Sequence, residues 1–351
     1  MRVERDRFLR RNLWWIIPLV LLHLVIVLAG FVAPHDPTAQ NREWPYAPPT
    51  RLHFVDNSGL HLRPFIYAWV AGGDANDDPD HDSRYREDRT HAYSLRAFIR
   101  GDAYSFLGLF ETNLHLFGVD DPGKLLLFGT DEFGRDEFSR LLWGGQISIA
   151  AGLVAAAVTL VLGSIAGLVA GYFGGWIDET LMGTSELFLS LPWLYFLLGV
   201  RAFLPLHVSP ARTFLLLVCV IGLIGWASPA RILRGVVLSS RTRNYVAAAR
   251  GFGASNFYIL RRHVLPDTSS VLLTQAALLV PRYIAAEVAL SFFGLGVNEP
   301  TPSWGNMLAA LQQYSVLISY GWMLAPALAL FITSVMYYLL ADALHSRLES
   351  R

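Results

Sequence analysis

Long apolar runs with few charged side chains recur along this chain of 351 residues. A helix rises about 1.5 Å per residue, so about 20 apolar residues cross a hydrocarbon core of about 30 Å. Helices suit this setting because they bond their backbone polar groups internally. The composition agrees, since 53% of the residues are hydrophobic and 16% are charged, against about 25% charged in a soluble domain. The sequence therefore predicts an all-α polytopic membrane protein.

Six of these runs predict six membrane-spanning helices. They lie at about residues 13–33, 147–172, 181–203, 213–233, 269–292 and 322–340. The first run is long for a signal peptide and has no small-x-small cleavage site before Pro34, so we expect a retained span. Pro326 predicts a kink in the last span.

The arginines predict the orientation. Residues 1–12 hold five arginines ahead of the first span, and seven more lie between the fourth and fifth spans: Arg231, Arg234, Arg241, Arg243, Arg250, Arg261 and Arg262. Positively charged loops remain in the cytoplasm, so both sets independently give the same orientation. We therefore expect residues 1–12, the loop 234–268 and the tail 344–351 inside, and residues 34–140 outside.

Residues 34–140 form the one long polar segment, ahead of a five-helix core at 141–343. Short aromatic and β-branched stretches between turn residues indicate a small, partly β-structured subdomain there. The acidic residues 74–88 lack the spacing of a calcium-binding loop, which favours a solvated loop. At the end of the segment, Thr130 is a candidate cap for an amphipathic lead-in helix, in which Asp131, Arg135, Asp136 and Arg140 have i,i+4 spacings.

Small and ionisable residues distinguish several of the spans. Gly163, Gly167 and Gly171 recur every fourth residue, which predicts close approach of another helix. Glu186, Arg282 and Glu287 lie in or near spans, where charge is costly and usually functional. For Glu186 we expect a salt bridge to a loop arginine rather than a proton relay. Arg282 either pairs with Glu287, the alternative we favour, or selects an anionic group on a substrate.

Residues 244–266 are a polar, basic island between two apolar runs. Their sequence predicts two short helices interrupted at Gly251 and Gly253. Ser255 caps the second helix and Pro266 ends it. Such a hairpin cannot bury itself, so it is either a docking surface in the cytoplasm or an ordinary loop that contacts nothing.

Three stretches resemble one known family. Ala247, Ala248 and Ala249, then Gly253, then the ending HVLP at 263–266 resemble the EAA loop of permease subunits of bacterial ABC importers. The resemblance is strongest to the C-type subunit of dipeptide and oligopeptide importers. Residues 128–140 (FGTDEFGRDEFSR) and 287–308 (EVALSFFGLGVNEPTPSWGNML) resemble two further family segments. Ala247 replaces the usual glutamate of the loop.

This resemblance implies a permease of the type I ABC importer fold, which carries short peptides across the bacterial inner membrane. Its EAA loop would be the coupling helix that docks on a cytoplasmic ATPase. In this chain the loop comprises Tyr245, Ala247, Ala248, Ala249, Gly251, Gly253, Ala254, His263, Leu265 and Pro266. The implied partners are two ATPase subunits that bind ATP and Mg, a second homologous permease subunit and an external solute-binding protein.

The sequence contains no catalytic motif that would indicate an enzyme. The sequence has no GxxxxGK[ST] loop and no credible HExxH or GxSxG site, so we expect no cofactor or metal in this chain. Its one cysteine, Cys219, excludes an internal disulfide, and zero formal net charge gives no indication of nucleic-acid binding.

Three alternatives remain open at this point. The same machinery could import nickel chelates, glutathione or another peptide-like solute. An ion-driven secondary transporter could use Glu186, Arg282 and Glu287, although no convincing internal repeat supports it. A membrane-anchored enzyme or sensor lacks a catalytic constellation.

Overall fold

A computed structural model of the chain describes residues 16–56, 59–72, 84–106, 108–192, 195–196, 199 and 210–349. The chain divides into two compact units. The helical unit comprises Met1–Leu19, Ile149–Leu290 and Leu330–Arg351, and the mixed unit comprises Val20–Ser148 and Ser291–Ala329. Several parts of the predicted organisation lie outside the described residues: residues 1–15, residues 74–83 of the acidic stretch, residues 193–194, 197–198 and 200–203 of the third span, and residues 350–351 of the tail.

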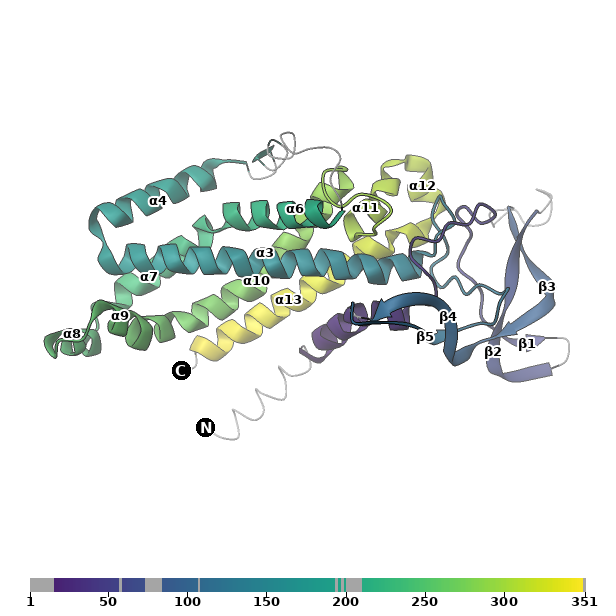
Figure 1. Cartoon of the computed structure of the whole chain (residues 1–351), viewed down its shortest axis with the longest axis horizontal. Helices are drawn as coiled ribbons and strands as arrows, with labels where there is room; N and C mark the ends of the chain where they lie inside the picture. Colours follow the sequence, from purple (N-terminus) through teal and green to yellow (C-terminus); the bar gives the residue numbers. More distant parts are fainter. Residues whose placement is uncertain are drawn as a thin grey trace. The chain divides into compact units, whose positions relative to one another are not determined.

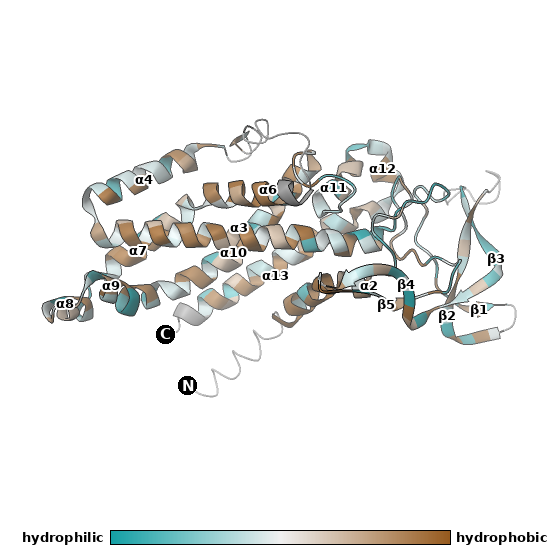
Figure 2. Ribbon diagram, viewed as in Figure 1, coloured by the Kyte–Doolittle hydropathy of each residue, from teal (hydrophilic) through white to brown (hydrophobic). Residues whose placement is uncertain are grey.

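Four described helices are long and apolar enough to cross a membrane: Glu137–Phe173, Phe214–Ser240, Asn256–Phe292 and Gly321–Ser346. They coincide with the predicted second, fourth, fifth and sixth spans, and brown, hydrophobic residues are most evident in Figure 2 on the first two of these helices. A shorter apolar helix, Ile16–Val27, lies within the predicted first span. The predicted third span begins in α4 (Gly175–Ser190), which ends before the extended Leu191, and only part of the span beyond it is described. The total of six spans stays a prediction.

The helical unit contains α4 and most of the long helices (Figure 1). Its other elements are α3 (Glu137–Phe173) from residue 149 onward, α6 (Pro210–Gly225), α7 (Ala227–Ser240), α8 (Asn244–Gly251), α9 (Asn256–Ile259), α10 (Leu265–Phe292) to residue 290, and α13 (Ala325–Glu349) from residue 330. Trp226 separates α6 from α7, so the fourth candidate span is two helical pieces.

The glycine stripe on α3 brings that helix against α7. A Cβ atom on Gly163 would lie 2.7 Å from Pro229 Cγ, and one on Gly167 would lie 2.5 Å from the carbonyl oxygen of Ala230. A Cβ atom on Gly171 would lie 2.8 Å from the Cβ atom of Val237. Because these distances leave no room for a side chain, the predicted close approach of a neighbouring helix is confirmed.

The mixed unit contains the β-structure predicted for residues 34–140. Strands β1 (His53–Asp56), β2 (Gly59–Ala71) and β3 (Tyr85–Ser94) form an antiparallel sheet, while β4 (Arg96–Phe106) pairs with β5 (Phe110–Gly118). Trp69 of β2 packs with Ala47 and Leu126, while the short helix α2 (Ala29–Val32) packs on β4 and β5. Strand β3 was not predicted because its residues are mostly charged or polar.

The remaining elements of the mixed unit follow α10. They are α11 (Trp304–Ala309), α12 (Tyr314–Ser319) and two 3₁₀ turns, Ala310–Gln312 and Gly321–Leu324. Ser303 caps α11 through a reciprocal capping box with Asn306. The fully buried Trp304 donates its indole N–H to the carbonyl oxygen of Leu141, 2.9 Å away, and so fixes the start of α11 against α3.

The predicted lead-in helix before the second span is wrong. Residues 128–136 are turns and extended chain, and α3 begins at Glu137. Gly129 and Gly134 adopt φ values of +69° and +70°, which end helical geometry. Thr130 caps no helix, because its hydroxyl accepts from the N–H of Ala47 at 2.8 Å and donates to the carbonyl of Trp44.

Two prolines act differently from the prediction. Pro266 does not end the second hairpin helix, because α9, the π-helical turn Leu260–Val264 and α10 form one continuous run. Proline fits the first turn of a helix, and the adjoining π-turn absorbs the change in register. Pro326 is the second residue of α13, after a 3₁₀ turn, so it starts that helix instead of kinking it.

Candidate functional site

The polar island at residues 244–266 folds as a hairpin between α7 and α10, here called the coupling hairpin (Figure 1). Helix α8 ends where Phe252 N–H bonds to Ala248 O and Gly253 N–H bonds to Arg250 O, both at 3.0 Å. Gly253 has φ +79°, a conformation that glycine adopts without steric cost. Gly251 is still helical, so Gly253 alone makes the sharp turn.

The second arm of the coupling hairpin starts with a side-chain cap. Ser255 has extended backbone angles, and its hydroxyl accepts from the N–H of Tyr258 at 3.3 Å. This confirms the N-cap that the sequence predicts. From there the chain runs without interruption into α10, so the second arm is the beginning of a candidate span.

The coupling hairpin is anchored to the ends of two other helices. Val246, Ile259 and Val264 form a buried cluster with Tyr172 of α3 and Val237 of α7. Two polar contacts add to it: the hydroxyl of Tyr172 donates to Asn256 Oδ1 at 2.8 Å, and Arg241 donates to the carbonyl of Gly171 at 3.0 Å. The hairpin is therefore packed against the ends of α3 and α7, and it is continuous with α10.

The face of the hairpin away from this core is exposed. Of the predicted docking residues, Tyr245, Ala247, Ala248, Gly251, Gly253, Leu265 and Pro266 are exposed, whereas Ala249, Ala254 and His263 are half-buried. The structure adds Phe252, which is 92% exposed, together with Phe257 and Tyr258. Aromatic side chains are enriched at protein interfaces. The signal for these residues in the sequence is the presence of aromatic side chains next to glycines in a polar loop.

Tyr245 ties the two arms of the hairpin together. Its hydroxyl donates to the carboxylate of Asp267, and its ring lies 5.6 Å from the ring of His263. The bond to Asp267 raises the pKa of Tyr245 above its ordinary value. A cleft of about 460 Å³ opens beside this pair, lined by Ile232, Gly235, Val236, Ser239, Ser240, Arg243 and Asp267. Helix α8 has no acidic residue in its first turn.

Glu186 forms the salt bridge that the sequence predicts. Its Oε1 lies 3.7 Å from Nη1 of Arg231, and the two side chains are 65% and 47% exposed. At that exposure the pair contributes about 0–1 kcal/mol. A closer pair joins α4 to α7, because Arg234 donates two bonds of 2.5 Å to Asp178. These bonds lower the pKa of Asp178. The sequence did not predict this second pair.

Arg282 and Glu287 lie in different surroundings on α10. Arg282 is exposed, whereas Glu287 is completely buried in the helical unit. Five residues apart, the two side chains leave the helix about 140° from each other, which follows from 3.6 residues per turn. Their placement therefore does not favour the predicted pairing.

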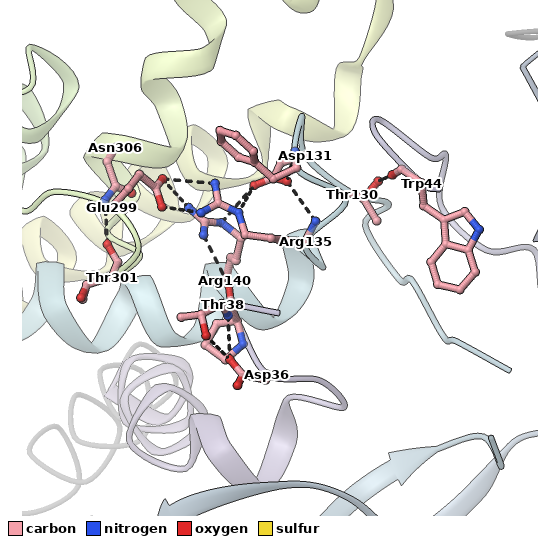
Figure 3. A network of polar contacts seen from close by, with 12 residues as sticks. Asp36, Thr38, Trp44, Thr130, Asp131, Arg135, Arg140, Glu299, Thr301 and Asn306 are labelled. Atoms are coloured by element: carbon pink, nitrogen blue, oxygen red, sulfur yellow. Dashed lines mark hydrogen bonds and ion pairs between the residues drawn. The ribbon is translucent and has the colours of Figure 1, made fainter. Parts of the chain in front are cut away.

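The mixed unit holds a second cluster of charges, in which the sequence predicts the spacing of Asp131 and Arg135 but not the contacts to Glu299 (Figure 3). Arg135 Nε lies 2.6 Å from Asp131, and its Nη1 lies 2.5 Å from Glu299. Arg140 reaches the same Glu299 at 2.8 Å. The side chains of Arg135 and Arg140 are 4% and 1% exposed. Burial lowers the pKa of Arg135, but bonds to Glu299 and Asp131 outweigh it and hold that pKa above its ordinary value.

The buried carboxylate of Asp136 lies close to this cluster. Asp136 accepts bonds from the N–H and the hydroxyl of Ser139, at 2.9 and 2.5 Å, while the backbone N–H of His35 lies 3.2 Å from that hydroxyl. Burial raises the pKa of Asp136 and lowers that of His35. Among the described residues, no group of three or more His, Cys, Asp and Glu side chains could hold a metal ion.

Comparison with known proteins gives a consistent set of relatives. Residues 160–350 match the family model of the binding-protein-dependent transport system inner membrane component. The dipeptide transport system permease protein DppC of Bacillus subtilis is 38% identical over 225 residues, which cover 64% of this chain and 68% of that relative. A putative peptide transport system permease protein of Brucella suis is 36% identical over 232 residues, covering 66% and 75%. The glutathione transport system permease protein GsiD of Pectobacterium atrosepticum is 31% identical with the same coverage.

Proposed function

This chain belongs to the family of binding-protein-dependent transport system inner membrane components, and on that premise we propose that it imports short peptides by coupling their passage to ATP hydrolysis on partner subunits. The chain is the permease and not itself the ATPase. Two ATPases that bind ATP and Mg, a second homologous permease and an external binding protein complete the proposed importer. The exposed coupling hairpin is the observation that carries this proposal.

The hairpin has the two properties that a coupling element needs. Its exposed face offers Phe252 and Phe257 to a partner, and its buried face is fixed to α3, α7 and α10 through one apolar core. A partner that moves this surface therefore moves the ends of three helices. We propose that the ATPases bind the hairpin in the cytoplasm and that their closure changes the access of the path between the two permease subunits.

The proposed topology has six spans with both chain ends in the cytoplasm, and it places the β-strands of the mixed unit outside. The arginines of loop 234–268 support the orientation. Of the three ionisable candidates, we assign Arg282 to the translocation path, because its side chain is exposed on a candidate span. We assign structural roles to Glu186, which pairs with Arg231, and to Glu287, which is buried.

The proposed substrate is a short peptide because two of the relatives described above are named as dipeptide and peptide permeases. Glutathione or another peptide-like solute is the second candidate. It is favoured by the glutathione permease among the relatives.

Replacing Phe252 with alanine tests the docking surface. The side chain is 92% exposed in the chain alone, so its removal should leave folding unchanged. An aromatic buried at the centre of an interface contributes about 2 kcal/mol or more. We therefore expect Phe252→Ala to reduce at least tenfold the amount of ATPase that co-purifies with the tagged chain from native membranes.

Tyr314→Ala is the matched control. Tyr314 is 76% exposed, but it lies in α12 of the mixed unit, which we propose to be on the other side of the membrane. That variant should retain the full amount of ATPase. Equal recovery with both variants, at unchanged thermal stability, would show that the hairpin does not dock the ATPase.

A further inference from the structure

A cavity of about 310 Å³ lies within the mixed unit beside the Arg135 and Arg140 cluster. That volume is in the range of small-molecule sites, which begin at about 300 Å³. The cavity is formed by the start of α3, the chain after α10, and the α11 to α12 region. Its lining is mixed: Met307, Met323 and Ala310 supply apolar surface next to the charged groups.

The charges around this cavity do not balance. Four carboxylates line it, from Asp131, Glu132, Glu137 and Glu299, against the two guanidinium groups of Arg135 and Arg140. The carboxylates of Asp131, Glu132 and Glu299 exceed the two guanidinium groups by one negative charge, and ionisation of the buried Glu137 adds a second. Charge of one sign in a low-dielectric cavity attracts a ligand of the opposite sign.

Glu137 is the carboxylate with the greatest need for a partner. Its side chain is 1% exposed, and its Oε2 has no hydrogen-bond donor among the described residues. The two neighbouring arginines bond to other groups: Arg135 to Asp131 and Glu299, and Arg140 to Glu299 and the carbonyl of Pro37. Burial without a partner disfavours the ionised form of this carboxyl group, and a ligand that supplies a cationic donor stabilises that form.

The chemistry favours an ammonium group over a metal ion. The described residues contain no cluster of three or more metal-ligating side chains, and most of the charged lining is already in ion pairs. An ammonium group carries one positive charge and three N–H donors, which suits one unpartnered carboxylate oxygen. We propose that this cavity binds the α-ammonium group of a peptide, with Glu137 as its carboxylate partner. The identity of that ligand as a peptide rests on the proposed function.

The test compares dialanine with N-acetyl-dialanine, which lacks the ammonium group. Titration calorimetry on the full-length chain in lipid nanodiscs should show dialanine binding at least ten times more tightly than the acetylated peptide. In Glu137→Gln we expect the affinity for dialanine to fall at least tenfold, while the affinity for N-acetyl-dialanine stays the same. The matched control is Glu111→Gln, which removes an exposed carboxylate on β5 of the same unit, outside the cavity lining, and should leave both affinities unchanged.

Several outcomes overturn the ammonium site. These are equal affinity of the wild-type chain for both peptides, no dialanine binding by the wild-type chain, or an unchanged dialanine affinity in Glu137→Gln. Because the two peptides are compared on the wild-type chain, that part of the test does not depend on whether a variant folds. Recovery of ATPases with the wild-type chain is scored separately, so an importer that fails these titrations loses the ammonium site and keeps the proposed function.

Discussion

Replacing Arg140 with methionine is expected to destabilise the mixed unit by about 1–3 kcal/mol, below the cost of breaking a fully buried ion pair, because the Glu299 side chain is 43% exposed. The Arg140 side chain is 1% exposed, and its guanidinium reaches Glu299 at 2.8 Å and Asp131 at 3.5 Å. Methionine fills much of the same volume but leaves these carboxylates with only Arg135. The expected result is a large fall in the thermal unfolding temperature of the purified chain in detergent.

Arg96→Met provides the matched comparison. Arg96 also pairs with a carboxylate, that of Asp120 at 3.0 Å, but the two side chains are 56% and 52% exposed. Exposed pairs contribute about 0–1 kcal/mol, so this variant should unfold close to the wild-type temperature. If the two variants were equally stable, the buried cluster would not be what connects the start of α3 to the chain around Glu299.

Replacing Gly167 with leucine is expected to prevent α3 and α7 from packing. Even a Cβ atom at this position would lie 2.5 Å from the backbone oxygen of Ala230 and 2.9 Å from Leu233 Cβ. Backbone atoms cannot rotate away as a flexible side chain does, so the helices must separate. Overpacking costs about 1–3 kcal/mol and sometimes more. We expect most of the chain to aggregate when it is extracted into mild detergent and passed through size-exclusion chromatography.

Gly235→Leu controls for the added side chain. Gly235 lies on α7, one of the same two helices, but a Cβ atom there would meet nothing within 4 Å. Leucine is also the better helix former by roughly 1 kcal/mol. This variant should elute as a single peak like the wild-type chain. A single peak for Gly167→Leu as well would contradict the close α3 to α7 contact.

The sequence predicted features that depend on local pattern. Four apolar runs, the glycine stripe, the Ser255 cap and the β-structure of the insert all agree with the structure. Each rests on hydrophobic length, residue spacing or turn chemistry within a short window. Family membership likewise follows from stretches that are contiguous in the chain.

The sequence did not predict features that depend on distant residues. Glu299 reaches Arg135 across 164 positions, and Asp178 reaches Arg234 across 56, so no local spacing indicates either pair. The lead-in helix failed for the same reason. Its i,i+4 charges predict a helix, but Thr130 bonds to the chain at residues 44–47, which holds the segment in turns. The Asp131 and Arg135 pair does form, within a turn rather than a helix.

The coupling hairpin has some features that depend on local sequence and others that depend on distant residues. Its helices, its Gly253 turn and its exposed small residues follow from residues 244–266 alone. Its attachment to Tyr172 and Val237 does not, because those residues belong to α3 and α7. Pro266 was misjudged because the π-helical turn that accommodates it has no recognisable sequence pattern.

The central claim is that this chain works as a permease with ATPases bound to its coupling hairpin. The most direct measurement is a pull-down of the tagged, full-length chain from detergent-solubilised native membranes, with its companions identified by mass spectrometry. We predict recovery of P-loop ATPase subunits and of a second, homologous membrane subunit. Recovery of the chain alone, under conditions that keep other membrane complexes intact, would contradict the account.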